Sequence, residues 1–184
     1  MDNINYDEIE KDLIDNRKVI TYYVETINMK YKHFDNKNKE GIYSFWYYNS
    51  NDKIKELNRN LIIEGPNKIK HKINWDWNLE DEYICLYVGK TRDFKKRISQ
   101  QLLLKTNNLK NINGNQLNKK ITSCQLRSGF DYLYSNKDNI YIKNELMEHI
   151  FLSLYHENDF VRRFYIEDYL IGKLRPWFNV DSER

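Results

Sequence analysis

The sequence has few of the features that mark a secreted, membrane-spanning or zinc-finger protein. Its 184 residues include only Cys85 and Cys124, too few for a disulfide framework or a cysteine-based zinc site. No apolar run approaches the roughly 20 residues of a membrane span, and the acidic N-terminus does not resemble a signal peptide. The formal net charge is only +3, so any basic surface must be local. We therefore expect a cytoplasmic protein with reduced cysteines and no membrane partner.

The residues that are present fit a single globular domain. Hydrophobic residues make up 40% of the chain and charged residues 31%, and the length is sufficient for a sizeable core. We expect one domain, in which residues 1–36 form an N-terminal helical segment and residues 37–184 form the core, with an insertion at about 50–82. The N-terminal segment contains apolar residues at three- and four-residue steps, which predict a helix over 5–33.

A strand followed by a basic helix is predicted around Gly89. Residues 83–88 are apolar and β-favouring, and Gly89 would supply a tight turn. Thr91 or Asp93 can cap the next helix, whose buried face would hold Phe94, Ile98 and Leu102.

In this arrangement Tyr87 at the strand end and Arg97 in the helix converge, which indicates a place to hold a phosphate. Two other interpretations apply to the same stretch. Gly89-Lys90-Thr91 is similar to the end of a P-loop, but that loop requires glycine where this chain has Ile84, so it is excluded. A strand–turn–helix with surface lysines also serves as plain scaffold, and these residues alone do not decide between the two.

Residues on both sides of this stretch match the motifs of a known protein family. Gly41-Ile42-Tyr43 opens an apolar run upstream, and Arg97 lies ten positions after Tyr87. With Tyr87-Val88-Gly89, and with Glu167 and Asn179 downstream, the chain resembles the GIY-YIG nucleases from about residue 40 to the C-terminus. The two tripeptides match the two family motifs in order.

The resemblance implies metal-assisted hydrolysis of a phosphodiester bond. Glu167 would hold Mg²⁺ (or Mn²⁺), and Arg97 would offset negative charge on the phosphate. Asn179 would orient the substrate or lock its loop. The implied fold is a small α/β (α+β) domain with helices around a mostly antiparallel sheet, whose three strands we place at residues 41–49, 83–88 and 147–156.

Tyr43 and Tyr87 are implied to position or deprotonate the attacking water, and we expect Tyr43 to be the base. Because a tyrosine has an ordinary pKa of about 10, a nearby cation must tune it, either Lys90 or the metal. Family members often have histidine or tyrosine four residues after the arginine, and this chain has Gln101, which cannot carry a proton.

Glu167 is also predicted to lie on the apolar face of its helix, an unusual place for a carboxylate. Asp159 can cap this helix, and Glu167 completes an apolar stripe formed by Phe160, Phe164, Ile171 and Leu174. An inward-pointing carboxylate is costly unless it is paired. The partner would be an arginine (Arg97, Arg127 or Arg163) or a Mg²⁺ ion, and the resemblance favours the ion.

Two further segments also give expectations. Residues 123–134 are predicted to form a helix, capped by Ser123, with Leu126, Phe130, Leu133 and Tyr134 on one face. His149 and His156 are seven apart on a segment predicted to be extended, which makes them poor co-ligands for a metal.

The insertion separates Tyr43 and Tyr87 by 44 positions, where the family more often has a short hairpin. Its basic residues Lys68, Lys70, His71 and Lys72 would lie on an extra hairpin. They could follow a DNA backbone or protect a sheet edge from aggregation, and we favour DNA. Gly89 and Arg127 are further candidates for substrate contacts.

The leading expectation is a Mg²⁺-dependent, sequence-specific DNA endonuclease of the restriction type. Its partner would be double-stranded DNA, and one site per chain suggests a homodimer or sequential nicking. One alternative is a structure-, single-strand- or RNA-directed nuclease in repair or phage defence. The other is a nucleic-acid-binding module without catalysis.

Overall fold

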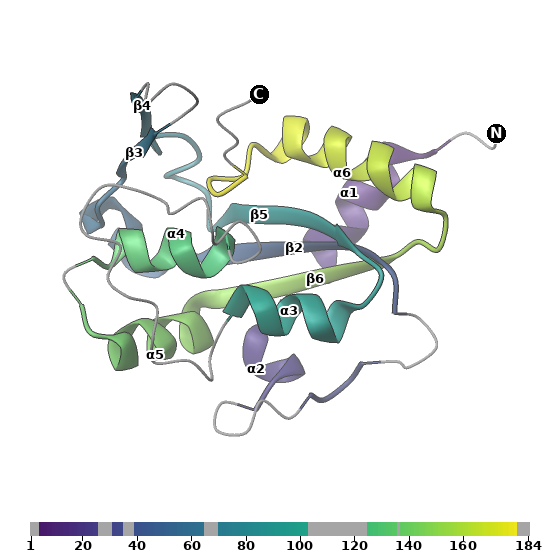
Figure 1. Cartoon of the computed structure of the whole chain (residues 1–184), viewed down its shortest axis with the longest axis horizontal. Coiled ribbons are helices and arrows are strands. Elements are labelled where there is room, and N and C mark those ends of the chain that lie inside the picture. Colours follow the sequence, from purple (N-terminus) through teal and green to yellow (C-terminus); the bar gives the residue numbers. More distant parts are fainter. Residues whose placement is uncertain are drawn as a thin grey trace.

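The computed structural model describes residues 4–25, 31–34, 39–64, 70–102, 125–135 and 137–179. Its elements, in chain order, are α1 (Tyr6–Asp15), β1 (Lys18–Val19), α2 (Ile20–Tyr23), β2 (Gly41–Tyr48), the 3₁₀ helix η1 (Ser50–Glu56), β3 (Asn60–Glu64), β4 (Lys70–Asn74), β5 (Tyr83–Thr91), α3 (Phe94–Leu102), α4 (Gln125–Leu133), α5 (Asn139–His149), β6 (Ile150–His156) and α6 (Phe160–Leu174) (Figure 1). Within these ranges, every helix is too short or too polar to cross a bilayer.

An antiparallel sheet with the strand order β1-β6-β2-β5 lies at the centre of the fold. The expected α+β class is confirmed, but the sheet has four strands and not three. The fourth is the short β1, in which Lys18 and Val19 pair with Leu152 and Phe151 of β6. This pairing covers one edge of β6 and makes the N-terminal segment part of the sheet.

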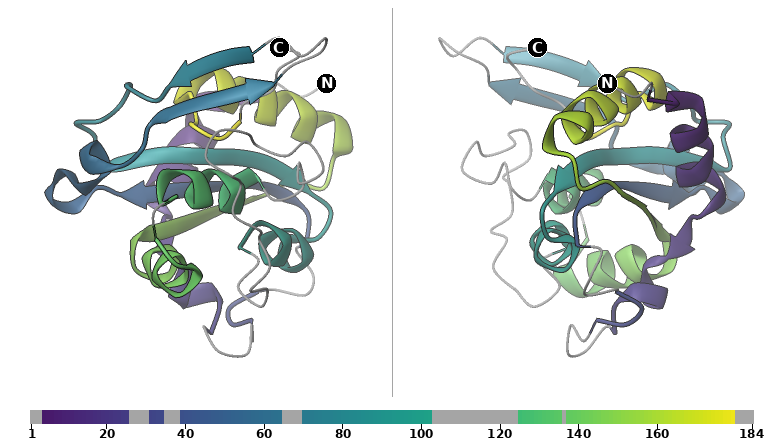
Figure 2. Two further views of the ribbon diagram at one scale, coloured as in Figure 1. Left: turned by 60° about the vertical axis from the view of Figure 1, so that its left-hand side comes forward. Right: turned by 90° about the vertical axis from the view of Figure 1, so that its right-hand side faces the viewer.

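Helices cover both faces of the sheet (Figures 1 and 2). Successive side chains of a strand point to opposite faces, so β2 contributes Ile42 and Trp46 to one core and Tyr43 and Phe45 to the other. Helices α1 and α6 pack on the first face, and α3, α4 and α5 pack on the second. Tyr43 is thereby placed between the sheet and α3.

The single helix predicted over 5–33 is wrong. Helix α1 ends at Asp15, and Asn16 is its C-cap. The β-branched residue Val19 follows in β1, where pairing with β6 gives it a sheet partner that an isolated helix lacks, and Ile20 begins the short helix α2. The apolar positions Ile9 and Leu13 are buried as expected, on the face shared with α6.

The third predicted strand begins three residues too early. Residues 147–149 are the last turn of α5, and β6 starts at Ile150. Asp138 begins α5, because its side chain accepts a hydrogen bond from the amide of Tyr141. The helix predicted over 123–134 is confirmed as α4, with Leu126 and Phe130 buried, while Ser123 lies outside the described residues.

The insertion contains the predicted hairpin, formed by β3 and β4. Trp75, just after β4, is buried and stacks on Trp177, with ring centroids 5.8 Å apart and planes 5° apart. This stacking connects the hairpin to the C-terminal segment. Lys72 is exposed, Lys70 opens β4, and Lys68 lies outside the described residues.

Gly41 opens β2 at a point where no side chain fits. A Cβ atom there would lie 1.9 Å from the backbone oxygen of Tyr155 on β6. Gly41→Ala is therefore expected to lower the free energy of unfolding by about 3 kcal/mol, because backbone atoms have to move. Urea denaturation measures the loss. Gly172→Ala is the matched control, since a Cβ there meets nothing within 4 Å and should stabilise α6 by about 0.5–1 kcal/mol. Equal stability of Gly41→Ala and the wild type would contradict the close approach.

Candidate active site

The rings of two tyrosines lie close together on one face of the β2–β5 pair. Tyr43 lies opposite Gly89, and its ring centroid is 5.9 Å from that of Tyr87. The turn predicted at Gly89 is wrong, because this residue lies inside β5. A Cβ at Gly89 would lie 2.5 Å from the Tyr43 hydroxyl oxygen. Glycine is therefore needed here because the phenol passes close to the backbone.

Helix α3 brings two polar side chains to the Tyr43 hydroxyl. Asp93 caps the helix by accepting a hydrogen bond from the Lys96 amide, as predicted. Arg97 donates from Nε to the Tyr43 oxygen at 3.0 Å, and Gln101 donates from Nε2 at 3.4 Å. Gln101 is buried, and its own oxygen accepts from the amide of Leu126. Gln101 thus holds the phenol in place, a role for which the sequence carried no signal.

The ionisation of the two tyrosines follows from their burial. Burial raises the pKa of Tyr43 well above its ordinary value, although the Arg97 guanidinium works against the rise. The pKa of Tyr87 is also raised, mainly by burial, and Arg97 again opposes the rise. At neutral pH Tyr43 is therefore a neutral phenol that accepts two hydrogen bonds. A base role for Tyr43 requires a further cation close to its oxygen.

Buried tyrosines make the fold sensitive to alkaline pH. Burial also raises the pKa of Tyr47 and that of Tyr23 to about 12, whereas unfolded tyrosines ionise near pH 10. A raised folded-state pKa contributes stability that is complete below about pH 10 and is lost as pH rises further. We expect Tyr43→Phe to reduce the loss of unfolding free energy between pH 10 and 11 by up to about 1.4 kcal/mol. Urea denaturation across this range measures the difference, and the surface variant Tyr165→Phe is the matched control. An unchanged pH dependence in Tyr43→Phe would contradict the burial argument.

Glu167 reaches the outer edge of β5 from α6. Its Oε1 accepts a hydrogen bond from the backbone amide of Lys90 at 3.0 Å, and its Oε2 forms an ion pair with the Lys90 ammonium group. The carboxylate also acts electrostatically on Tyr87, raising the pKa of that residue after the larger effect of burial. The side chain of Glu167 remains 15% exposed.

The arginine partners considered for Glu167 are engaged elsewhere. Arg127 is fully buried, pairs with Asp131 at 2.8 Å and donates to the backbone oxygen of Leu102. This ion pair lies inside the α3–α4 packing, which leaves Arg127 unsuited to contact a substrate. Arg97 contacts Tyr43, as described above.

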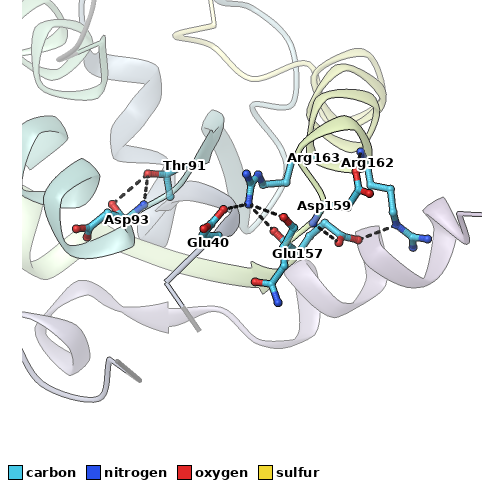
Figure 3. A network of polar contacts seen from close by, with 8 residues as sticks. Glu40, Thr91, Asp93, Glu157, Asp159, Arg162 and Arg163 are labelled. Carbon is cyan, nitrogen blue, oxygen red and sulfur yellow. Dashed lines mark hydrogen bonds and ion pairs between the residues drawn. The ribbon is translucent and has the colours of Figure 1, made fainter. Parts of the chain in front are cut away.

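Arg163 is the centre of a separate polar network at the start of α6 (Figure 3). It is buried, forms an ion pair with Glu40, and donates to the backbone oxygen of Glu157 at 2.9 Å. Glu157 in turn pairs with Arg162 at 2.8 Å, and Asp159 caps α6 as predicted. Because Glu40 directly precedes β2, the network fixes the strand of Tyr43 relative to the helix of Glu167.

The apolar stripe predicted for α6 is wrong in its first half, since Ile171 and Leu174 pack against the core but Phe160 and Phe164 are exposed. The buried face carries Arg163, Ile166 and Leu170. Phe160 is 56% exposed and Phe164 is 49% exposed. The ion pair of Arg163 with Glu40 turns a charged position inward and leaves these aromatic residues outside. Glu167 therefore flanks the buried face and does not complete it.

Asn179 closes the remaining edge of β5. Its amide nitrogen donates to the Val88 backbone oxygen and its amide oxygen accepts from the Val88 nitrogen, both at 2.7 Å. The amide of Phe178 bonds to the oxygen of Leu86 at 2.8 Å. Of the two roles predicted for Asn179, locking its loop matches these contacts. They also satisfy strand groups that an uncovered edge would expose.

The structure thus gathers Tyr43, Tyr87 and Arg97 on one side of β5 and places Glu167 with Lys90 at its edge. The Lys90 ammonium group lies where a cation would bind the carboxylate. One carboxylate, joined by oxygens of water and phosphate, is a donor set that fits Mg²⁺.

A guanidinium such as that of Arg97 can pair with a phosphate, and a carboxylate such as that of Glu167 can bind a cation. The phenol of Tyr43 offers an O–H group next to the same guanidinium. Comparison with protein-family models, with curated proteins and with solved structures finds no match to this chain.

Proposed function

We propose that this chain is a Mg²⁺-dependent DNA endonuclease of the GIY-YIG type. The observation that carries the proposal is the position of Tyr87, which lies beside Tyr43 and Arg97 and is also within electrostatic reach of Glu167, although these motif residues are far apart in sequence. Structural packing alone explains the tyrosines. It does not explain a guanidinium and a carboxylate that both act electrostatically on Tyr87 and yet have partners other than each other.

Each residue has a role in this reaction. Arg97 would offset the charge that develops on the phosphate oxygens, and its bond to Tyr43 fixes its orientation. Tyr43 would orient the attacking water through its hydroxyl, and Tyr87 flanks the same position. Glu167 would hold the metal ion together with water molecules.

Bound Mg²⁺, or Mn²⁺ in its place, would supply Lewis-acid stabilisation of the phosphate and of the leaving oxygen. Lys90 would release Glu167 when the ion binds, and its ammonium group would then be free to contact the substrate. Cutting both strands of a duplex would require two chains or two successive events, since each chain contributes one such site.

The experiment that tests the proposal offers three substrates to the wild-type protein, with Mg²⁺ or with EDTA. The substrates are long duplex DNA, denatured DNA and RNA. Discrete duplex fragments that form only with Mg²⁺ would support a sequence-specific endonuclease. Degradation of the single-stranded substrates alone would support the second candidate below. Binding without cleavage of any substrate would leave a binding module and overturn the proposal.

A second candidate, a nuclease that acts on unpaired strands, is favoured by the outer surface of α6. This surface exposes Phe160, Val161, Phe164 and Tyr165. The Lys90 ammonium group lies 4.8 Å from the Phe164 ring centroid, and the Arg92 guanidinium lies 5.5 Å from that of Phe160. Exposed aromatic faces beside cations are typical of surfaces on which unpaired bases stack.

Phe164→Ala separates the two candidates. If unpaired bases stack on α6, this variant should bind single-stranded DNA about tenfold more weakly, because one base–aromatic contact is lost. Its affinity for duplex DNA should stay close to that of the wild type, and its stability should change little because the ring is half exposed. Fluorescence anisotropy with labelled oligonucleotides measures both affinities. An unchanged single-strand affinity would remove the second candidate's support.

A further inference from the structure

A cluster of possible metal ligands lies at the end of α5, away from the candidate active site. Glu145, Glu148 and His149 are spaced by three and four residues, which places them on one face of the helix. Their ligand atoms all lie within 4.8 Å of one another. Helix spacing produces many such acidic groups by chance, so the cluster alone indicates nothing.

The second observation is the state of the His149 side chain. The residue is only 8% exposed, and neither of its ring nitrogens has a hydrogen-bonding partner among the described residues. Its Nε2 faces Glu145, 3.8 Å from Oε2. A buried imidazole normally satisfies at least one nitrogen, because an unpaired polar group in the interior is costly. A ligand bound to Nε2 of His149 would give that nitrogen a partner.

Neighbouring residues orient His149 and Glu145 in the way that the residues around a metal site orient its ligands. The ring of His149 packs on that of Tyr47, with centroids 5.5 Å apart. The hydroxyl of Tyr134 donates to Glu145 at 2.7 Å, the kind of outer hydrogen bond that orients a ligating carboxylate. His149 is also the last residue of α5, where the helix dipole favours a cation.

We propose that Glu145, Glu148 and His149 form a binding site for Zn²⁺. An imidazole nitrogen favours Zn²⁺ over Mg²⁺, and two carboxylates complete a three-ligand set with a position left for water. Zn²⁺ binds such ligands at about 2.0–2.2 Å, so the side chains must draw together by a small rotation. Glu148 is exposed and can move, and it provides the route by which the ion enters.

This site is separate from Glu167. Tyr47, which packs on His149, lies four residues from Tyr43 along β2, a distance of roughly 13 Å. The two sites also differ in their ligand chemistry, since Glu167 has no imidazole beside it among the contacts of the described chain. Zn²⁺ binding at α5 therefore does not depend on the proposed nuclease activity.

The test follows the imidazole signals in a ¹H–¹³C spectrum during titration with Zn²⁺ in metal-free buffer. The chain has only four histidines, so the signal missing from His149→Phe identifies His149. We expect this signal to shift and to saturate at one equivalent of Zn²⁺, and to stay unmoved by Mg²⁺. Glu148→Gln should weaken Zn²⁺ binding at least tenfold. Glu56→Gln, which removes an exposed carboxylate elsewhere, and Glu167→Gln should leave it unchanged.

Two results would overturn the proposal. One is a wild-type His149 signal that does not move even at millimolar Zn²⁺. The other is a Glu148→Gln variant that binds Zn²⁺ as tightly as Glu56→Gln does. Because Glu148 is exposed and its replacement removes no packing, the second comparison remains decisive even if His149→Phe fails to fold.

Discussion

Glu167→Gln is expected to lower the single-turnover rate of DNA cleavage about a thousandfold. Glutamine has the same shape and can still accept the hydrogen bond from the Lys90 amide, but it lacks the charge that binds a metal ion. The lost ion pair with Lys90 is partly buried, so stability should fall by about 1–3 kcal/mol. Quenched-flow cleavage at fixed Mg²⁺ and urea denaturation measure the two effects.

The matched control for this variant is Glu56→Gln, which makes the same chemical change at an exposed position outside the candidate active site. It should cleave at the wild-type rate. DNA affinity measured with EDTA, without a divalent ion, should be similar in all three proteins, because in the proposed site Glu167 would contact the metal and not the DNA. A Glu167→Gln variant that cleaves normally would show that the carboxylate only closes the edge of β5.

Arg97→Met is expected to reduce cleavage by a factor of about 10²–10³. Methionine keeps part of the apolar stem of arginine, but it loses the charge and the hydrogen bond to Tyr43. The cleavage rate of Arg97→Lys should fall between those of the wild type and Arg97→Met. Lysine retains the charge but not the planar fork that can contact a phenol and a phosphate together. Rates and binding constants for the three proteins measure the series.

The control for this series is Lys96→Met, which removes a charge from the adjacent position of α3. Lys96 is exposed, so a general loss of positive charge would affect both methionine variants alike. A normal rate in Arg97→Met, or equal losses in Arg97→Met and Lys96→Met, would contradict a specific role for the guanidinium.

Local sequence patterns predicted the main strands and part of the site. The apolar run after Gly41 predicted β2, and the geometry of a strand followed by a helix predicted that Tyr87 and Arg97 converge. The meeting of Tyr43 with these residues was implied only by the family resemblance, since η1, β3 and β4 separate β2 from β5. The pairing of β1 with β6 was not predictable in this way, since it joins residues more than 130 positions apart.

The helix α6 shows why the site was predicted less well than the sheet. Phe160 and Phe164 share a helical spacing with Glu167, and so do Arg163, Ile166 and Leu170 with one another. Hydrophobicity favoured the first set as the buried face. The second set is buried because Ile166 and Leu170 pack in the core with α1 and β2, and Arg163 pairs there with Glu40, contacts that no local pattern encodes.

His149 illustrates a similar error with a different consequence. Interpreted as part of a strand, it pointed away from His156 and had no partner. As the last residue of α5 it lies one turn from Glu145 and next to Glu148. The boundary between α5 and β6 therefore decided whether the cluster could be recognised, and helix boundaries are the least certain feature of a sequence-based assignment.

The most direct test of the proposed function is the Mg²⁺ dependence of the single-turnover cleavage rate, measured for the wild type and for Glu167→Gln on the same duplex DNA. We expect the wild-type rate to rise with Mg²⁺ and to saturate, and the variant to remain at the background rate at every concentration. Identical Mg²⁺ dependence in the two proteins, or no cleavage by either, would contradict the assignment of Glu167 as the metal ligand of a nuclease site.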